Sequence, residues 1–215
     1  KYWEKSIFDD TEIKGGVAIS LRDSEVKGNP IGLFTPYQEL NSIIQSVTGR
    51  KDFKSMSDIV ITRTAYRFTD KMHEDHPEAL SQLSNGHPYD MSTNIFERLP
   101  QVFFDKKPND GKDYIRILGR EENTRVLKYV RRDYIRPVEN LDDYKVFLSK
   151  ANGTGAFGEV LTQPIMGESG VGNTETFISI GKFSAVFEAK AVSKYISTKF
   201  AIALLGALKT TQDIT

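Results

Sequence analysis

Two segments near the middle of the chain alternate apolar and polar residues and are joined by a short polar connection. The segments are residues 113–119 and 124–130, and the connection is residues 120–123. Alternation with a period of two places one face of a strand on a core and the other face in solvent. Two such runs around a short polar connection predict a β-hairpin.

The second predicted strand of this hairpin has two mixed faces. One face carries Arg125, Leu127, Tyr129 and Arg131, and the other carries Val126, Lys128 and Val130. Neither face is fully apolar, which indicates a sheet edge or a binding surface. We expect Arg125 and Arg131 to lie on the binding side together with Tyr129, and Lys128 to lie on the opposite side.

Strands and helices of comparable weight are predicted along the rest of the chain. The expected strands are residues 17–21, 59–62, 144–150 and 175–181, and a helix is expected between Thr35-Pro36 and Gly49. The elements do not alternate regularly as βαβ units. We therefore expect an α+β fold with a mixed or antiparallel sheet, a β-hairpin and a long C-terminal packing helix.

The C-terminal helix is expected to run as one element because its apolar residues recur at spacings of three and four. They are Ala189, Val192, Ile196, Phe200, Ala203 and Ala207. Such a stripe packs against a core. Residues 201–208 are apolar on nearly all sides, so we expect this half of the helix to be buried.

Total charge excludes no class of partner, because 29 basic residues balance 29 acidic residues. Charge is uneven along the chain, however. The run from Arg125 to Arg136 holds five basic residues and one acid. A basic patch on a folded surface can attract an anionic ligand, although it can equally be an ordinary solvated face.

The composition bears on the compartment in which the chain works and on contact with membranes. The sequence has no cysteine, which excludes disulfides and thiolate metal sites and agrees with a reducing compartment. Its longest apolar run, residues 201–205, is far shorter than the ~20 residues that cross a bilayer. We expect a cytoplasmic location and no membrane partner, and we expect the chain to be part of a longer protein.

Several motifs that resemble catalytic or cofactor sites lack a required part. Residues 153–158 match the glycine pattern of dinucleotide-binding loops, but a strand-like run follows where a helix is required. Residues 167–174 resemble a phosphate-binding loop with asparagine in place of lysine. His73 and His76 have a spacing that can bind a metal, but their neighbours are polar and typical of a solvated helix start. No catalytic motif is complete.

Five blocks, taken together and in order, resemble the C-terminal region of bacterial restriction–modification enzymes that fuse an adenine-specific DNA methyltransferase to a recognition domain (Type IIG-like enzymes). The blocks are residues 13–17, 144–158, 175–181, 194–201 and 208–213. In that family this region is the target recognition domain, and the Asp/Asn-Pro-Pro-Tyr and nuclease motifs lie upstream. The absence of adjacent prolines agrees with this placement.

The resemblance implies that the chain has two parts and that catalysis takes place upstream of it. Residues 1–24 would be the end of the preceding methyltransferase domain or a linker strand, and residues 25–215 would be the target recognition domain. The parent enzyme would be an adenine-specific methyltransferase, with endonuclease activity left open. Its S-adenosylmethionine and Mg²⁺ would bind upstream, so we expect no cofactor, no metal and no catalysis in this chain.

We therefore expect a sequence-specific module that binds double-stranded DNA and contacts the upstream methyltransferase domain in cis. Basic side chains would hold phosphates, and arginine or asparagine would read base edges. The candidate DNA contacts are Arg125, Arg131, Arg132, Lys150 and Asn152. Two alternatives stay open at this point: a protein-interaction or scaffold domain of the same enzyme, and a small-molecule enzyme that uses the glycine-rich segment.

Overall fold

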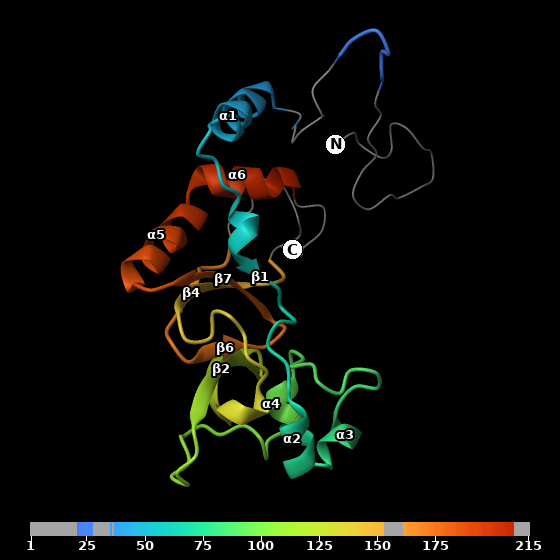
Figure 1. Ribbon diagram of the computed structural model, residues 1–215, viewed down its shortest axis with the longest axis vertical. Coiled ribbons are helices and arrows are strands. Elements are labelled where there is room, and N and C mark those ends of the chain that lie inside the picture. Colours follow the sequence, from blue (N-terminus) through green and yellow to red (C-terminus); the bar gives the residue numbers. More distant parts are fainter. Residues whose placement is uncertain (1–20, 28–34, 36, 153–160, 209–215) are drawn as a thin grey trace. The chain divides into compact units, whose positions relative to one another are not determined.

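The computed structural model describes residues 21–27, 35, 37–152 and 161–208 (Figure 1). The chain divides into two compact units. The larger unit contains residues 56–151 and 162–198, and it holds every strand among the described residues together with helices α2 to α5. The smaller unit contains helices α1 and α6. The boundary expected between residues 24 and 25 stays a prediction.

The larger unit contains a four-stranded antiparallel sheet in the order β1-β7-β4-β5. Its strands are β1 (Val60–Ile61), β4 (Tyr144–Ser149), β5 (Ile165–Gly167) and β7 (Phe177–Phe183). The two central strands, β4 and β7, are buried over most of their length, as continuous apolar runs require. The strands expected at residues 59–62, 144–150 and 175–181 are thus confirmed.

The second sheet is mixed and contains the predicted hairpin. Strands β2 (Tyr114–Glu121) and β3 (Thr124–Arg131) pair in antiparallel fashion, and β6 (Val171–Asn173) pairs with β2 in parallel. The hairpin is confirmed, but its connection is shorter than expected, because Arg120 and Glu121 belong to β2. Only Glu122 and Asn123 form the turn, with φ angles of 46° and 63°. Two successive positive φ angles are typical of a type I′ turn, whose twist matches that of the strands.

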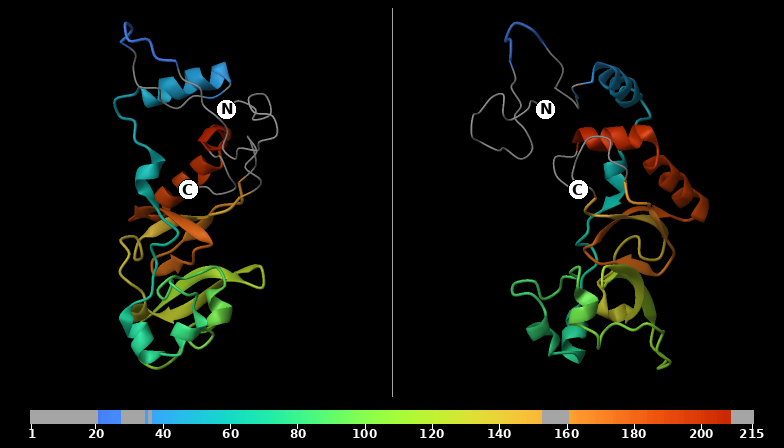
Figure 2. Two further views of the ribbon diagram at one scale, coloured as in Figure 1. Left: turned by 90° about the vertical axis from the view of Figure 1, so that its right-hand side faces the viewer. Right: turned by 180° about the vertical axis from the view of Figure 1, so that it is seen from behind.

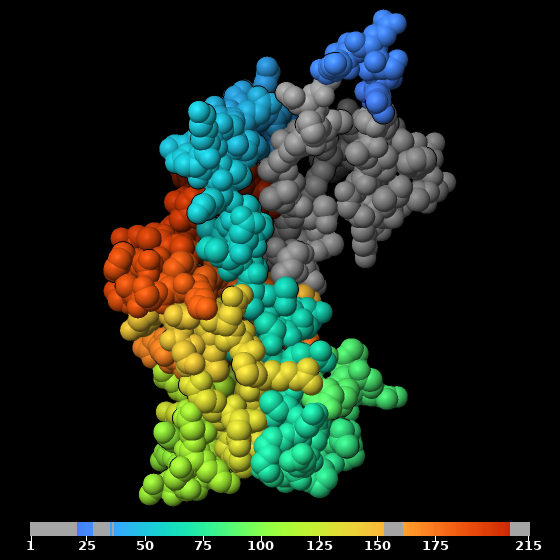
Figure 3. All heavy atoms as spheres, viewed as in Figure 1, coloured from blue at the N-terminus to red at the C-terminus, as the bar shows by residue number. Residues whose placement is uncertain are grey.

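Helices and loops of the larger unit cover the hairpin and the four-stranded sheet (Figures 1 and 2). Helices α2 (Asp70–Asp75), α3 (Ala79–Gln82) and α4 (Ile95–Arg98) precede β2, and helix α5 (Val186–Ile196) contacts β4, β5 and β7. Segments distant in sequence meet on the visible face in Figure 3, where residues near 67 and 136 lie side by side. The main core gathers Tyr66, Phe68, Phe96, Ile117 and Val130, among other buried residues.

A buried polar network links this core to β7. The Tyr66 hydroxyl donates to Asn140 Oδ1 at 2.7 Å, and Asn140 Nδ2 donates to Ser179 Oγ and to the carbonyl oxygen of Gly181, both at 3.1 Å. Burial raises the pKa of Tyr66, with a further contribution from Asp142. Buried polar groups that are paired in this way fix one arrangement of the elements they join.

Lys145 of β4 is buried, and its ammonium group is held by backbone carbonyls. Nζ donates to the carbonyl oxygens of Leu141 at 2.9 Å, Val171 at 2.8 Å and Glu168 at 3.3 Å. Burial lowers the pKa of Lys145 to about 8, although Asp143 and Asp142 act in the opposite direction. Lys145 thus connects β4 by hydrogen bonds to Glu168, between β5 and β6, and to Val171 at the start of β6.

The C-terminal helix expected from one stripe of apolar residues is divided in two. Helix α5 ends at Ile196, and helix α6 (Lys199–Leu208) begins after Ser197 and Thr198. Ser197 Oγ donates to the carbonyl oxygen of Ser193, and Thr198 Oγ1 donates to that of Tyr195. Side chains that bond to the backbone compete with helical bonding, which accounts for the break. Residues 200–205 are half-buried.

The other expectations have mixed outcomes. The α+β class and a helical C-terminal region are confirmed. Helix α1 (Gln38–Thr48) lies where a helix was expected, although its N-cap is Tyr37. The strand expected at residues 17–21 and the glycine-rich segment 153–158 lie largely or wholly outside the described residues. No helix in the described part of the chain is long and apolar enough to cross a membrane.

Candidate functional site

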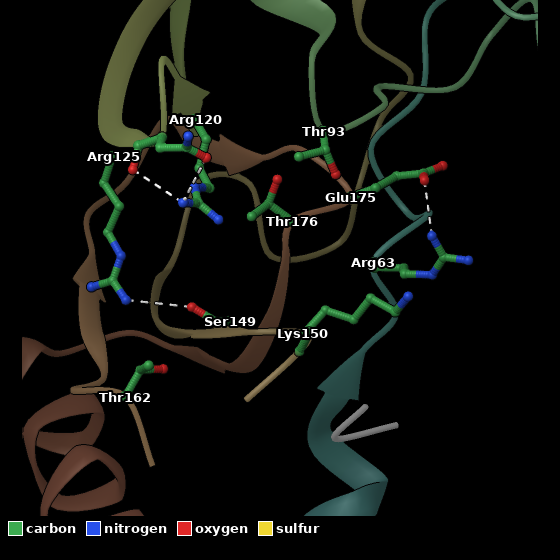
Figure 4. A pocket seen from close by; sticks show the side chains of 11 residues that line it. Arg63, Thr93, Arg120, Arg125, Ser149, Lys150, Thr162, Glu175 and Thr176 are labelled. Atoms are coloured by element: carbon green, nitrogen blue, oxygen red, sulfur yellow. Dashed lines mark hydrogen bonds and ion pairs between the residues drawn. The ribbon is translucent and has the colours of Figure 1, made fainter. Parts of the chain in front are cut away.

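A pocket of about 420 Å³ opens on the larger unit where the ends of both sheets meet (Figure 4). The turn end of the hairpin, the end of β4 and the connection between β6 and β7 form its walls. Its lining residues are Arg63, Thr93, Arg120, Asn123, Arg125, Ser149, Lys150, Ala151, Thr162, Glu175 and Thr176. All of them belong to the larger unit.

The lining combines positive charge with hydroxyl groups. Among the lining residues that the structure describes, four side chains are arginine or lysine, only Glu175 is acidic, and three threonines and a serine add hydroxyls. Guanidinium, ammonium and hydroxyl groups are the donors that proteins use for phosphate oxygens. The pocket is therefore suited to an anionic ligand with several acceptor oxygens.

The hairpin places two arginines at the turn end of the pocket. Arg120 and Arg125 are opposite each other in the β2–β3 register. Arg120 Nη2 donates to the carbonyl oxygen of Asn123 at 3.1 Å and to its Oδ1 at 3.3 Å. Arg125 Nη2 donates to Ser149 Oγ at 3.4 Å, and its guanidinium carbon lies 6.0 Å from the ring centroid of Phe177.

Across the pocket from Arg125, the lining includes an ion pair. Arg63 Nη1 and Glu175 Oε2 form a 2.8 Å ion pair, and Figure 4 shows this pair across the pocket from Arg125 and Ser149. Glu175 is fixed through its backbone, because its N–H donates to the carbonyl oxygen of Met91. The carboxylate of Glu175 is thus paired on the side away from the hairpin.

Two of the five predicted contact residues, Arg125 and Lys150, line this pocket. Lys150 follows β4, and its backbone N–H donates to the carbonyl oxygen of Thr176 at 2.8 Å. Asn152 is buried and is not among the lining residues. The adjacent glycine-rich segment, residues 153–158, lies outside the described residues.

Arg131 has a different environment from Arg125, although both lie on β3. It pairs with Asp75 at 2.8 Å and with Asp133, and its guanidinium carbon lies 4.3 Å from the ring centroid of Tyr134. Hydrogen bonding to Asp133 raises the pKa of Arg131. The structure therefore does not bring Arg131 into the pocket with Arg125 and Lys150. Arg131 lies six positions beyond Arg125 on β3, about 20 Å along the strand.

Arg132 and Lys128 are also neutralised by neighbouring carboxylates. Arg132 pairs with Asp142 at 2.7 Å and with Asp113 at 2.8 Å. Lys128 lies on the buried face of β3, as expected, and pairs with Glu121 and Asp105. Tyr129 exchanges two backbone hydrogen bonds with Phe104, so β3 is not a free edge there. The basic run from residue 125 to 136 thus contributes only Arg125 to the pocket.

Sequence reasoning missed Arg63, Arg120 and the hydroxyl groups of the lining. Arg120 could have been found by assuming a two-residue turn, which places it opposite Arg125. The others come from segments far apart in the chain.

The described residues include no group of three or more histidine, aspartate or glutamate side chains that could hold a metal ion. His73 Nε2 lies 2.7 Å from the carbonyl oxygen of Pro88, and His76 Nδ1 lies 3.1 Å from Glu78 Oε1. The segment resembling a phosphate-binding loop forms the end of β5, a turn and β6, with no helix after it.

The fold and the site define an α+β protein with a cationic pocket at the joined ends of two sheets. No family model, no curated protein and no solved structure matches this chain. The resemblance to recognition domains of restriction–modification enzymes therefore stays a prediction.

Proposed function

We propose that this chain is a non-catalytic module that binds double-stranded DNA in a sequence-specific manner, within a restriction–modification methyltransferase or endonuclease. The observation that carries the proposal is the pocket, whose described residues supply four cationic side chains, four hydroxyl groups and one paired carboxylate. The DNA backbone dominates affinity in such complexes and is held by these groups.

The proposal assigns different roles to the five residues expected from the sequence. Arg125 and Lys150 contact phosphates from the pocket, and Arg120 joins them. Arg131 and Arg132 maintain the fold through their ion pairs. Asn152 is buried, so we do not assign it to base reading.

The proposal also includes the setting implied by the resemblance. The upstream methyltransferase domain would supply S-adenosylmethionine binding and the rest of the DNA footprint. This division agrees with the balanced total charge of the chain, because a recognition module alone would then need only a local cationic site.

Selection from a random duplex pool tests the proposal. Pools of duplexes with a randomised centre are bound to the protein at 50 mM salt and re-bound at 150 mM salt, and the recovered DNA is sequenced. We expect enrichment of one short sequence and a steep fall of affinity with salt. Recovery of unenriched DNA, with no dependence on salt, would contradict the proposal.

Helix α5 supports a second candidate function, a protein-interaction or scaffold role. Phe187 is 70% exposed and Tyr195 is 41% exposed, and with Ala191 between them they share one helix face. Exposed aromatic residues are enriched in protein interfaces. Replacement of Phe187 by serine should weaken binding to the methyltransferase domain of the same enzyme under this reading and leave DNA binding unchanged.

A further inference from the structure

The turn end of the hairpin places two positive charges directly opposite each other. Arg120 of β2 and Arg125 of β3 are cross-strand partners, and their Cβ atoms are expected ~5 Å apart. Like charges at such positions destabilise a sheet. In the part of the chain that is described, neither guanidinium forms an ion pair with a carboxylate, whereas Arg116, Arg131 and Arg132 do.

Both arginines are held in place, and most of their donors form no hydrogen bond with the residues that the structure describes. Arg120 uses one nitrogen, Nη2, to bond Asn123, and Arg125 uses one, Nη2, to bond Ser149. A guanidinium carries five N–H donors, so several remain on each side chain. Ser149 accepts through Oγ in this contact, and its own hydroxyl proton can donate to a ligand.

We propose that Arg120 and Arg125 clamp one phosphate group between them, with the Ser149 hydroxyl as a third donor, and that this anion relieves the repulsion within the hairpin. The inference rests on the proposed function in that it names the chemical group bound at the same site. The phosphate can come from a nucleic-acid backbone or from a free phosphate compound, since the donors recognise the oxygens that both share.

The clamp makes an unusual prediction about stability. Replacement of Arg125 by glutamate turns the opposed like charges into an opposed ion pair. The anion-free protein should then melt at the same or a higher temperature, although the variant has lost its ligand. A lysine exposed on α5, Lys190, provides the matched control, because K190E makes the same change of charge outside the pocket.

Thermal unfolding in phosphate tests the clamp. The wild type, R125E and K190E are melted in chloride and in inorganic phosphate at equal ionic strength. We expect a saturable rise of about 3 °C at tenfold excess over the dissociation constant for the wild type and K190E. R125E should show only the small, unsaturable rise that phosphate gives any protein. A saturable rise in R125E equal to that of the wild type would overturn the clamp, as would a melting temperature in chloride well below that of K190E.

A second variant and a DNA arm separate the possible failures. R125Q removes the charge without reversing it and should lose the same saturable rise, which keeps the test informative if R125E does not fold. A short duplex replaces phosphate in the second arm. Stabilisation by phosphate but not by the duplex supports the clamp and contradicts the proposed function. Stabilisation by the duplex that is equal in the wild type and R125Q overturns the clamp and leaves the proposed function standing.

Discussion

Arg131 and Asp75 lie 56 positions apart in the sequence and form a 2.8 Å ion pair that joins β3 to the end of α2. The Tyr134 hydroxyl donates to the same carboxylate at 2.9 Å and accepts from Arg131 Nη1 at 2.8 Å. Because Arg131 is held in this arrangement, the basic run from residue 125 to 136 presents fewer unpaired charges than its composition indicates.

Arg131 should therefore act on stability and not on DNA binding. Replacement by alanine removes two ion pairs and a cation–π contact, and should lower the free energy of unfolding by about 1–2 kcal/mol. Urea unfolding measures this change. Affinity for DNA, measured below the unfolding transition, should stay within twofold of the wild type. A tenfold loss of affinity in a folded variant would restore Arg131 as a DNA contact.

Acid should weaken the same arrangement within a defined range of pH. Hydrogen bonds from Lys71 and Tyr134 lower the pKa of Asp75 to about 2, below its ordinary value of 3.8. The stabilisation is complete above pH 3.8 and is lost as pH falls toward 2, because the unfolded chain takes up the proton first. Unfolding followed between pH 5 and 2 should show a shallower decline for Asp75→Asn than for the wild type. Parallel curves for the two proteins would contradict this role.

Lys145 predicts a dependence of the same sign at alkaline pH. Its pKa is about 8 in the folded protein and 10.5 in the unfolded chain. Between these values the unfolded chain binds more protons, so the free energy of unfolding should rise with pH. The rise should be visible between pH 8 and 10, before tyrosines ionise in the unfolded chain, and absent in Lys145→Met. Exposed Lys190→Met is the control and should keep it.

The hairpin turn offers a stabilising substitution. Glu122 has a φ of 46°, in the left-handed region that costs a side chain such as glutamate about 1 kcal/mol. Asparagine tolerates this conformation better, so Glu122→Asn should raise the free energy of unfolding by about 0.5–1 kcal/mol. Glu122→Val should lower it, because a β-branched residue fits worse. Calorimetric melting of both variants gives the comparison, and an equal effect of both would show that the backbone at residue 122 is not strained.

The elements that were predicted correctly carry their signal locally. Alternation across β2 and β3 and the apolar run of β7 need no knowledge of the rest of the fold. The turn was assigned four residues because Arg120 and Glu121 are charged, yet charged residues are accommodated at the partly exposed end of a strand. The break between α5 and α6 was missed because the apolar stripe continues through Ser197 and Thr198, whose side chains bond to the helix backbone.

The pocket could be predicted only in part, because the sheet order assembles it. Arg63 follows β1 and Glu175 precedes β7, and these residues meet because β1 pairs with β7. The proximity of Arg63 and Glu175 therefore depends on strand pairing between distant segments of the chain. Composition also does not reveal the surroundings of Arg132, since counting basic residues does not show that Asp113 and Asp142 pair with it.

The salt dependence of binding to the selected duplex tests the central claim most directly. Fluorescence anisotropy is measured from 50 to 200 mM NaCl for the wild type, Arg125→Gln and the control Lys190→Gln. We predict that Arg125→Gln loses about tenfold in affinity, and that its slope of log K against log salt is shallower by about 1, as expected for one lost phosphate contact. Lys190→Gln should match the wild type. Identical affinity and slope for Arg125→Gln and the wild type would contradict DNA binding at this pocket.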